Sequence, residues 1–235
     1  MKCSALSDLG KNRKNNEDSF YCKDGSNLFI VADGLGGHSA GEIASDMATQ
    51  YVVNKNPQDL EELLNAVTEA NSHVYNEAKK LKNDMATTIS AMLIKNGKAY
   101  IAHVGDSRIY LIRGETVYRL TDDHTPVMES LRSGLITEEQ ARYHPLKHML
   151  SRTIGTHNQV EVDILQIDIE ENDFFIMCTD GLSNVVSEYD MYDIFLNEQD
   201  INKIPKNLVD LANFRGGPDN ITVVCVKIEA EDLVL

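Results

Sequence analysis

The sequence predicts an α+β fold built on antiparallel β-sheet. Short apolar runs typical of strands recur along the 235 residues, and helical periodicity is confined to a few segments partly segregated from them. Asn96-Gly97 separates two of the apolar runs, and Arg113-Gly114-Glu115 follows another. Both are turn signals, and Asn-Gly in particular suits a hairpin because both residues accept positive φ. We therefore expect consecutive strands to be antiparallel.

The individual elements follow from the same patterns. Strands are expected at residues 3–9, 28–32, 87–95, 98–104, 108–112, 160–167, 173–178 and 221–228. Helices are expected at residues 40–53, 60–81 and 188–196, with a shorter one at 206–214. Ser39-Ala-Gly-Glu42 fits a capping box at the start of the first helix, and Thr137-Glu-Glu-Gln140 fits another helix start.

The segment 122–156 differs from its surroundings. It is polar, contains His124, Pro126, Gly134 and His144-Pro145, and interrupts the succession of strands. Such a segment is typical of a mobile insert that carries function. We expect it to lie outside the main sheet structure.

Composition bounds the class of protein. With 42% hydrophobic and 25% charged residues, the chain can form one large core, so residues 1–235 are expected to be a single domain. No apolar run approaches the roughly 20 residues of a membrane helix, and the N-terminus lacks a signal-peptide pattern, so we expect a cytoplasmic protein without membrane attachment. The formal charge of −15 would repel a phosphate backbone, which argues against nucleic acid as a partner.

The four cysteines, Cys3, Cys22, Cys178 and Cys225, form no C-x-x-C pair and mostly lie within apolar runs. We interpret them as reduced core residues rather than metal or redox groups. No arginine stands six positions after any of them, which excludes the cysteine-based phosphatases.

Aspartates stand at the ends of several apolar runs. They are Asp18, Asp33, Asp106, Asp180 and Asp219. Each alone is also consistent with a turn, because Asp-Gly and Pro-Asp are good turn formers. Together they indicate a cluster, since strand ends of an antiparallel sheet meet at one edge. Ionised carboxylates gathered in a partly buried site either take up protons or bind cations, and oxygen-only ligands favour Mg²⁺ or Mn²⁺ over Zn²⁺.

These aspartates belong to short motifs that occur in a fixed order. The motifs are Arg13-x-x-Asn16-Glu17-Asp18, Val31-Ala-Asp33-Gly34-Leu-Gly-Gly-His38, Gly105-Asp106-Ser107-Arg108, Thr179-Asp180-Gly181 and Gly216-Gly-Pro-Asp219-Asn220. Across essentially the whole chain, this order resembles the metal-dependent type 2C protein phosphatases in their compact bacterial form. Each motif alone is weak, but their order and spacing together are highly specific.

The resemblance implies an antiparallel β-sandwich with helices on both outer faces, and a metal site at one end. By matching positions, Asp33 would bridge two Mn²⁺ or Mg²⁺ ions, the Gly34 carbonyl would bind one of them, and Asp180 and Asp219 would hold the other. Three further acidic residues match positions near the ions. Glu17 and Asp18 would contact them directly or through water, and Asp106 would be a ligand of a third, weaker ion.

Further roles follow from the same resemblance. Arg13 matches the arginine that grips the substrate phosphate, although a surface ion pair would also explain it. Asn220 would orient the Asp219 region. The insert, about residues 122–156, matches the flap that lies beside the catalytic centre and influences substrate choice.

The implied activity is that of a hydrolase that removes phosphate from phosphoserine and phosphothreonine in proteins. Hydrolysis of phosphate monoesters needs accelerations of up to about 10²¹-fold, which two cations roughly 3.5–4 Å apart can support by activating a water molecule, without a phosphoenzyme. The resemblance further implies a bacterial signalling enzyme that opposes a Ser/Thr kinase. We expect a monomer.

The sequence departs from the family pattern at several positions. Asn184 replaces an aspartate that helps hold the third metal in many members, so that ion is expected to bind more weakly. Leu35 replaces a histidine that acts as general acid in some members, which leaves His38 or a metal-bound water as candidates for that role; His38 is equally consistent with packing. Ala86 replaces a glycine, and we expect only a local change in packing.

Other functions are less consistent with the residues. The loop 33–41 lacks the spacing of nucleotide-binding glycine motifs. His144 and His148 have the spacing of zinc ligands on a helix, but Pro145 disfavours that helix, so a solvated or substrate-facing pair is favoured. Two alternatives to protein dephosphorylation remain, namely a phosphoprotein-binding domain without turnover and the hydrolysis of small phosphorylated metabolites.

Overall fold

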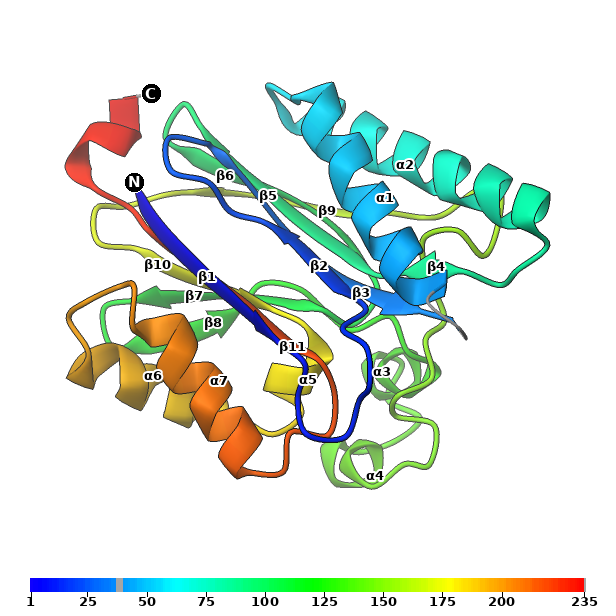
Figure 1. The fold of residues 1–235 in the computed structure, drawn as a ribbon. Coiled ribbons are helices and arrows are strands. Elements are labelled where there is room, and N and C mark those ends of the chain that lie inside the picture. Colours follow the sequence, from blue (N-terminus) through cyan, green and yellow to red (C-terminus); the bar gives the residue numbers. More distant parts are fainter. Residues whose placement is uncertain (37–39, 235) are drawn as a thin grey trace.

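In the computed structural model, which describes residues 1–36 and 40–234, two antiparallel sheets pack face to face between helical layers (Figure 1). The first sheet has five strands in the order β1-β11-β10-β7-β8. Their bounds are β1 Lys2–Asp8, β11 Ile221–Lys227, β10 Phe174–Cys178, β7 Arg108–Arg113 and β8 Thr116–Arg119. Every pair of neighbours in this sheet is antiparallel.

The second sheet has six strands in the order β2-β3-β5-β6-β9, with β4 paired to β3. The bounds are β2 Asp18–Tyr21, β3 Leu28–Leu35, β4 Ala86–Thr87, β5 Ile89–Lys95, β6 Lys98–Val104 and β9 Asp163–Asp168. Its neighbouring strands are antiparallel as well. In the turn between β5 and β6, Asn96 and Gly97 have φ of 54° and 71°, so the expected hairpin is confirmed.

Helices cover the outer face of each sheet. Helices α1 (Ala40–Lys55) and α2 (Leu60–Leu81) lie on the second sheet, whereas α6 (Glu188–Asn197) and α7 (Ile204–Phe214) lie on the first (Figure 1). Shorter elements complete the chain: α3 Pro126–Arg132, α4 Glu138–Arg142, α5 Asp180–Ser183 and the 3₁₀ helix η1 Ala230–Val234. The predicted α+β fold, a sandwich of α-β-β-α layers, is confirmed.

The central strands are mostly apolar because the sandwich buries both of their faces. In β3, Phe29 and Val31 point into the core between the two sheets, while Leu28 and Ile30 pack under α1 and α2. Strand β10 repeats this division. Phe175 lies between the two sheets, whereas Phe174 and Ile176 face the α6–α7 layer. Each fully buried large side chain stabilises the fold by about 1.5–3 kcal/mol.

Local signals fix several helix ends. Asp59 caps α2 by accepting a hydrogen bond from the Glu62 amide at 2.9 Å. The predicted capping box of Thr137 and Gln140 is present at the start of α4. The box predicted at Ser39 lies outside the described residues.

The structure also shows elements that the sequence patterns did not predict. Strands β2 and β8 are short edge strands, and α3 and α5 are short helices. Strand β3 continues past Asp33 because Gly34 and Leu35 pair with β4. In the insert 122–156, α3 and α4 lie between β8 and β9, outside both sheets (Figure 1).

All four cysteines carry free thiols. Cys178 and Cys225 are buried as expected, but Cys3 and Cys22 are only half-buried at the margin of the core between the sheets. None of the described helices has the length and apolar character that crossing a bilayer requires.

Candidate metal centre

The five candidate aspartates converge at one end of the sandwich, and they come from both sheets. Asp18, Asp33 and Asp106 lie at or next to the ends of β2, β3 and β6 in the second sheet. Asp180 follows β10 and Asp219 precedes β11 in the first sheet. The expected meeting point at the edge of a single sheet is therefore corrected to the shared end of two stacked sheets. The β2–β3 register places Asp18 directly opposite Asp33.

These carboxyl groups oppose one another's ionisation. Burial raises the pKa of Asp33 well above its usual range, and the charges of Asp18, Asp180, Asp106 and Asp219 raise it further. Burial is also the main cause that raises the pKa of Asp18 to about 7 and that of Asp106 to about 8. Such a cluster is stable in its ionised form only when positive charge is supplied.

Two threonine hydroxyls hold Asp18 in place. Thr179 and Thr222 donate to Asp18 Oδ2 at 2.8 and 2.7 Å. Among the described residues, Asp18 Oδ1 and Asp180 Oδ1 are buried without a hydrogen-bond partner. No role was predicted for either threonine, although Thr179 stands in the motif Thr179-Asp180-Gly181 and Thr222 lies at the start of β11. Buried carboxylate oxygens of this kind can accept bonds from a further ligand.

The donor set fits hard divalent cations. It consists of carboxylate oxygens, and the Gly34 carbonyl is available beside Asp33 on β3. Within the described residues, no three acidic, histidine or cysteine side chains are grouped closely enough to hold an ion by themselves. Mg²⁺ typically keeps several waters and takes only one or two carboxylates, so each ion would be completed by water. Oxygen ligands of this kind suit Mg²⁺ and Mn²⁺.

The loop before β2 is fastened to the cluster by Asn220. Its side-chain amide donates to the carbonyls of Leu9 and Asn15 at 2.9 and 3.0 Å, and its Oδ1 accepts from the Glu17 amide at 2.9 Å. The Asn220 backbone amide also donates to Asp219 Oδ1. Asn220 thus positions both the loop that carries Glu17 and the carboxylate next to it.

Arg13 lies at the mouth of the cluster. Its Nη2 donates to Asp219 Oδ2 at 2.6 Å, and its side chain is 52% exposed. The ion pair that the sequence left open as an alternative is therefore present. Arg13 also lines a cavity of about 530 Å³ together with Glu17, Asp33 and Asp219. A guanidinium in this position can reach an anion bound in the cavity with its remaining donors.

The departures from the family pattern have distinct structural outcomes. Asn184 donates from Nδ2 to Asp180 Oδ2 at 3.0 Å, so the amide supports Asp180 where a carboxylate would repel it. Leu35 ends β3, and His38 lies outside the described residues. Neither His144 nor His148 lies on a helix, as Pro145 indicates. His148 lies in a turn and lines the cavity beside Asp180.

Substitution of Gly181 by alanine tests how closely the two Asp-bearing segments must pack. An added Cβ would lie 1.9 Å from the Asn220 carbonyl oxygen, so α5 and the start of β11 would have to separate. We expect a loss of about 2–3 kcal/mol of unfolding free energy and a fall in Tm of roughly 5–10 °C. Thermal denaturation measures both.

Gly25→Ala is the matched control. Nothing lies within 4 Å of its added Cβ, and its φ of +77° makes it the harder position on backbone grounds alone. Gly25→Ala should lower the free energy of unfolding by only about 1 kcal/mol. A Gly181→Ala protein as stable as this control would show that the packing is not tight.

Comparison with known proteins agrees with these features. The family model described as Protein phosphatase 2C matches residues 10–206. The serine/threonine phosphatase stp of Listeria welshimeri is 37% identical over 241 aligned positions, which cover 97% of this chain and 96% of that protein. The solved serine/threonine phosphatase of S. agalactiae has a TM-score of 0.91 at 35% identity, covering 97% of this chain and 99% of that one. The catalytic domain of PstP, solved in complex with 2 manganese ions, has a TM-score of 0.88 at 33% identity, covering 97% and 98%.

Proposed function

Since the chain belongs to the protein phosphatase 2C family and is a metal-dependent serine/threonine protein phosphatase, we propose that it hydrolyses phosphoserine and phosphothreonine in proteins at a centre for two Mn²⁺ or Mg²⁺ ions. The observation that carries this proposal is the convergence of carboxylates from both sheets, with unpartnered buried oxygens on Asp18 and Asp180. A two-manganese complex of a similar catalytic domain supports it.

The roles of the acidic residues follow the positions matched in the sequence. Asp33 would bridge the two ions, with the Gly34 carbonyl on one and Asp180 and Asp219 on the other. The remaining carboxylates would lie around them: Glu17 and Asp18 would contact the ions directly or through water, and Asp106 would be a ligand of a third, weaker ion. When bound, the paired cations supply an activated water and offset charge on the phosphoryl group.

The chain's own residues prepare the site for the substrate. The hydroxyls of Thr179 and Thr222 fix the rotamer of Asp18, so little reorganisation is needed when positive charge arrives. Arg13 would donate to the phosphoryl oxygens and hold the group in line for attack. Among the described residues that line the cavity there is no cysteine, serine or threonine, so a phosphoenzyme on a thiol or hydroxyl side chain is disfavoured there.

Turnover of defined substrates tests the proposal. With Mn²⁺ present, we expect release of phosphate from phosphoserine and phosphothreonine peptides, and much less from sugar phosphates, which would be favoured if the enzyme acted on metabolites. Quenching during turnover of a ³²P-labelled phosphopeptide, in acid to preserve an aspartyl phosphate and in alkali to preserve a phosphohistidine, should leave no label on the protein. Labelled protein would contradict direct hydrolysis by water.

Removal of the Arg13 guanidinium should weaken phosphate binding. For Arg13→Ala we expect kcat/KM for a phosphopeptide to fall about 30- to 100-fold, mostly through KM, because a charge-assisted contact contributes about 2–3 kcal/mol. Steady-state kinetics measure the change. Lys14→Ala, an exposed neighbour that does not line the cavity, removes the same charge as a control. An unchanged KM in Arg13→Ala would refute phosphate contact.

We further propose that residues 1–235 act as one catalytic domain and as a monomer on proteins phosphorylated by a Ser/Thr kinase. Relatives that carry the name serine/threonine phosphatase match nearly the whole chain, which supports the single domain.

A further inference from the structure

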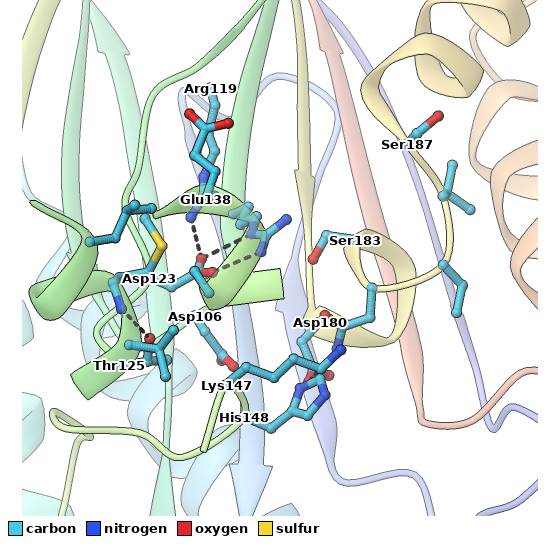
Figure 2. A pocket seen from close by; sticks show the side chains of 18 of the residues that line it. Asp106, Arg119, Asp123, Thr125, Glu138, Lys147, His148, Asp180, Ser183 and Ser187 are labelled. Carbon is cyan, nitrogen blue, oxygen red and sulfur yellow. Dashed lines mark hydrogen bonds and ion pairs between the residues drawn. The ribbon is translucent and has the colours of Figure 1, made fainter. Parts of the chain in front are cut away.

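A second and larger cavity opens beside the catalytic one. Its volume is about 720 Å³, and it lies between the insert and the α5–α6 region (Figure 2). The two cavities share lining residues, among them Asp106, Asp180, Lys147 and His148. A phosphoresidue bound at the carboxylate cluster would therefore have the adjoining part of its own chain next to the larger cavity.

The wall of this larger cavity contains two guanidinium groups that share one carboxylate. Arg108 binds Asp123 through Nε at 2.9 Å and Nη2 at 2.7 Å, and Arg119 Nη2 binds the same carboxylate. The side chains of Arg108, Arg119 and Asp123 are only 20%, 22% and 12% exposed, respectively. Burial lowers the pKa of Arg119, and the nearby charge of Arg108 lowers it further. Within this group, two guanidinium charges face one carboxylate. Glu138 also lines the cavity but forms no ion pair with either arginine in the described part of the chain, and Asp106 and Asp180 belong to the proposed metal centre.

Another arginine in the same cavity shows what a balanced arrangement looks like. Arg215 forms two hydrogen bonds with Asp190, at 2.6 and 2.7 Å, so this pair is neutral. By contrast, the Arg108–Asp123–Arg119 group faces the cavity with a surplus charge. In a chain with a formal charge of −15, a half-buried surplus cation that lines a cavity favours an external anion over a structural role.

A further donor lies on the opposite wall. The Ser183 hydroxyl on α5 is buried, and it has no hydrogen-bond partner among the described residues. Figure 2 shows Ser183 across the cavity from Asp123 and Arg119. An anion bound near the two arginines would give this hydroxyl an acceptor that it now lacks.

We propose that the Arg108–Asp123–Arg119 group binds an acidic side chain of the substrate protein, on the same chain as the phosphoresidue and two to four residues away from it. This inference rests on the proposed function, because it concerns which phosphoproteins the site accepts. Arg108 follows Asp106 by two residues, so their Cα atoms are at most about 7 Å apart. A few residues of extended substrate span that separation.

The charge balance favours a carboxylate over a second phosphate. One surplus positive charge is neutralised by the single charge of aspartate or glutamate. A phosphate group carries about −1.5 to −2 at pH 7, which would leave excess negative charge in a half-buried wall. The acceptor geometry of a carboxylate also matches the planar fork of an arginine.

Paired phosphopeptides test this proposal. Each pair has glutamate or glutamine at one position, from four residues before to four after the phosphothreonine, in an otherwise neutral sequence. For the wild-type enzyme with Mn²⁺, we expect kcat/KM to be roughly five- to tenfold higher for the glutamate peptide at one or more positions, as for a half-buried ion pair. Equal kcat/KM at every position would overturn the proposal, whereas failure to hydrolyse any peptide would instead overturn the proposed function.

Variants show whether the discrimination is local. In Arg119→Gln, which leaves Arg108 and Asp123 as a neutral pair, the glutamate-to-glutamine ratio should fall to about one. Arg119→Lys keeps the positive charge and should retain most of the preference for the glutamate peptide. Arg132→Gln is the matched control, because it removes an arginine of the insert that pairs with Asp122 outside the cavity.

The ratio is insensitive to loss of folded protein, since both peptides are affected alike. Discrimination that persists in Arg119→Gln, or that disappears equally in Arg132→Gln, would contradict a specific site at Arg119.

Discussion

Replacement of Asp33 by asparagine is expected to lower kcat/KM for phosphopeptides by a thousandfold or more, which corresponds to at least about 4 kcal/mol. Asp33 lies at the centre of the cluster, and the four other aspartates all act on its ionisation. A neutral amide cannot supply the bridging charge that we propose for two cations. Steady-state assays across a range of Mn²⁺ concentrations would measure the loss and show whether excess metal restores activity.

The same substitution should stabilise the metal-free protein. Asp33 is a carboxyl whose ionisation opposes Asp18 directly across the β2–β3 pair, and like charges in that position destabilise a sheet. Burial is the main cause that raises the pKa of Asp33, and asparagine keeps the shape of the side chain while being uncharged without taking up a proton. We therefore expect Asp33→Asn to have a higher Tm than wild type in the presence of a chelator, with the order reversed in Mn²⁺.

Asp46→Asn provides the control for both measurements. Asp46 is exposed on α1, and its substitution removes the same charge. It should leave activity and Tm unchanged. Activity of Asp33→Asn close to that of this control would contradict a bridging role, even if the stability result were as expected.

Sequence patterns predicted the central strands well because of a physical constraint. Strands such as β5 and β10 are buried on both faces by a neighbouring sheet and a helical layer, so most of their residues are apolar. The edge strands β2 and β8 have no such constraint. They are short and contain polar residues, and only pairing with a neighbour defines them.

The candidate site was predictable in its members but not in its geometry. Aspartates at strand ends are visible in the sequence, whereas the stacking of two sheets that brings Asp219 and Asp33 to the same end is a tertiary property. The hydrogen bonds and ion pairs that hold the site could not be predicted from the sequence either. Thr222 reaches Asp18 across 204 residues, and the sharing of Asp123 by two arginines depends on the β7–β8 hairpin.

Removal of divalent metal is expected to lower the stability of the protein, and increasingly so as pH rises. Ions that bind only the folded state add about 2.7 kcal/mol at a hundredfold excess over Kd, which is roughly 5–10 °C in Tm for a chain of this size. Calorimetry in chelator and in saturating Mn²⁺ would measure the difference at pH 5, 6, 7 and 8.

The sign of the pH dependence follows from the direction of the pKa shifts. The carboxyls of Asp18 and Asp106 have pKa values of about 7 and 8 in the folded protein, raised mainly by burial from an ordinary value of 3.8. The metal-free folded state therefore keeps protons that the unfolded chain has already lost, and its stability decreases as pH rises from about 4 to 8. Bound cations compensate the ionised cluster, so the Mn²⁺ form should not show this decrease.

The gap between the two forms should consequently be small at pH 5 and largest at pH 8. High monovalent salt distinguishes this effect from general charge screening, because buried carboxylates are screened far less than surface ones. In 0.3 M NaCl the chelated protein should still lose stability with rising pH. A metal-free protein that becomes more stable between pH 5 and 8, or that melts at the same temperature with and without Mn²⁺ at pH 8, would show that these aspartates do not form a cation site.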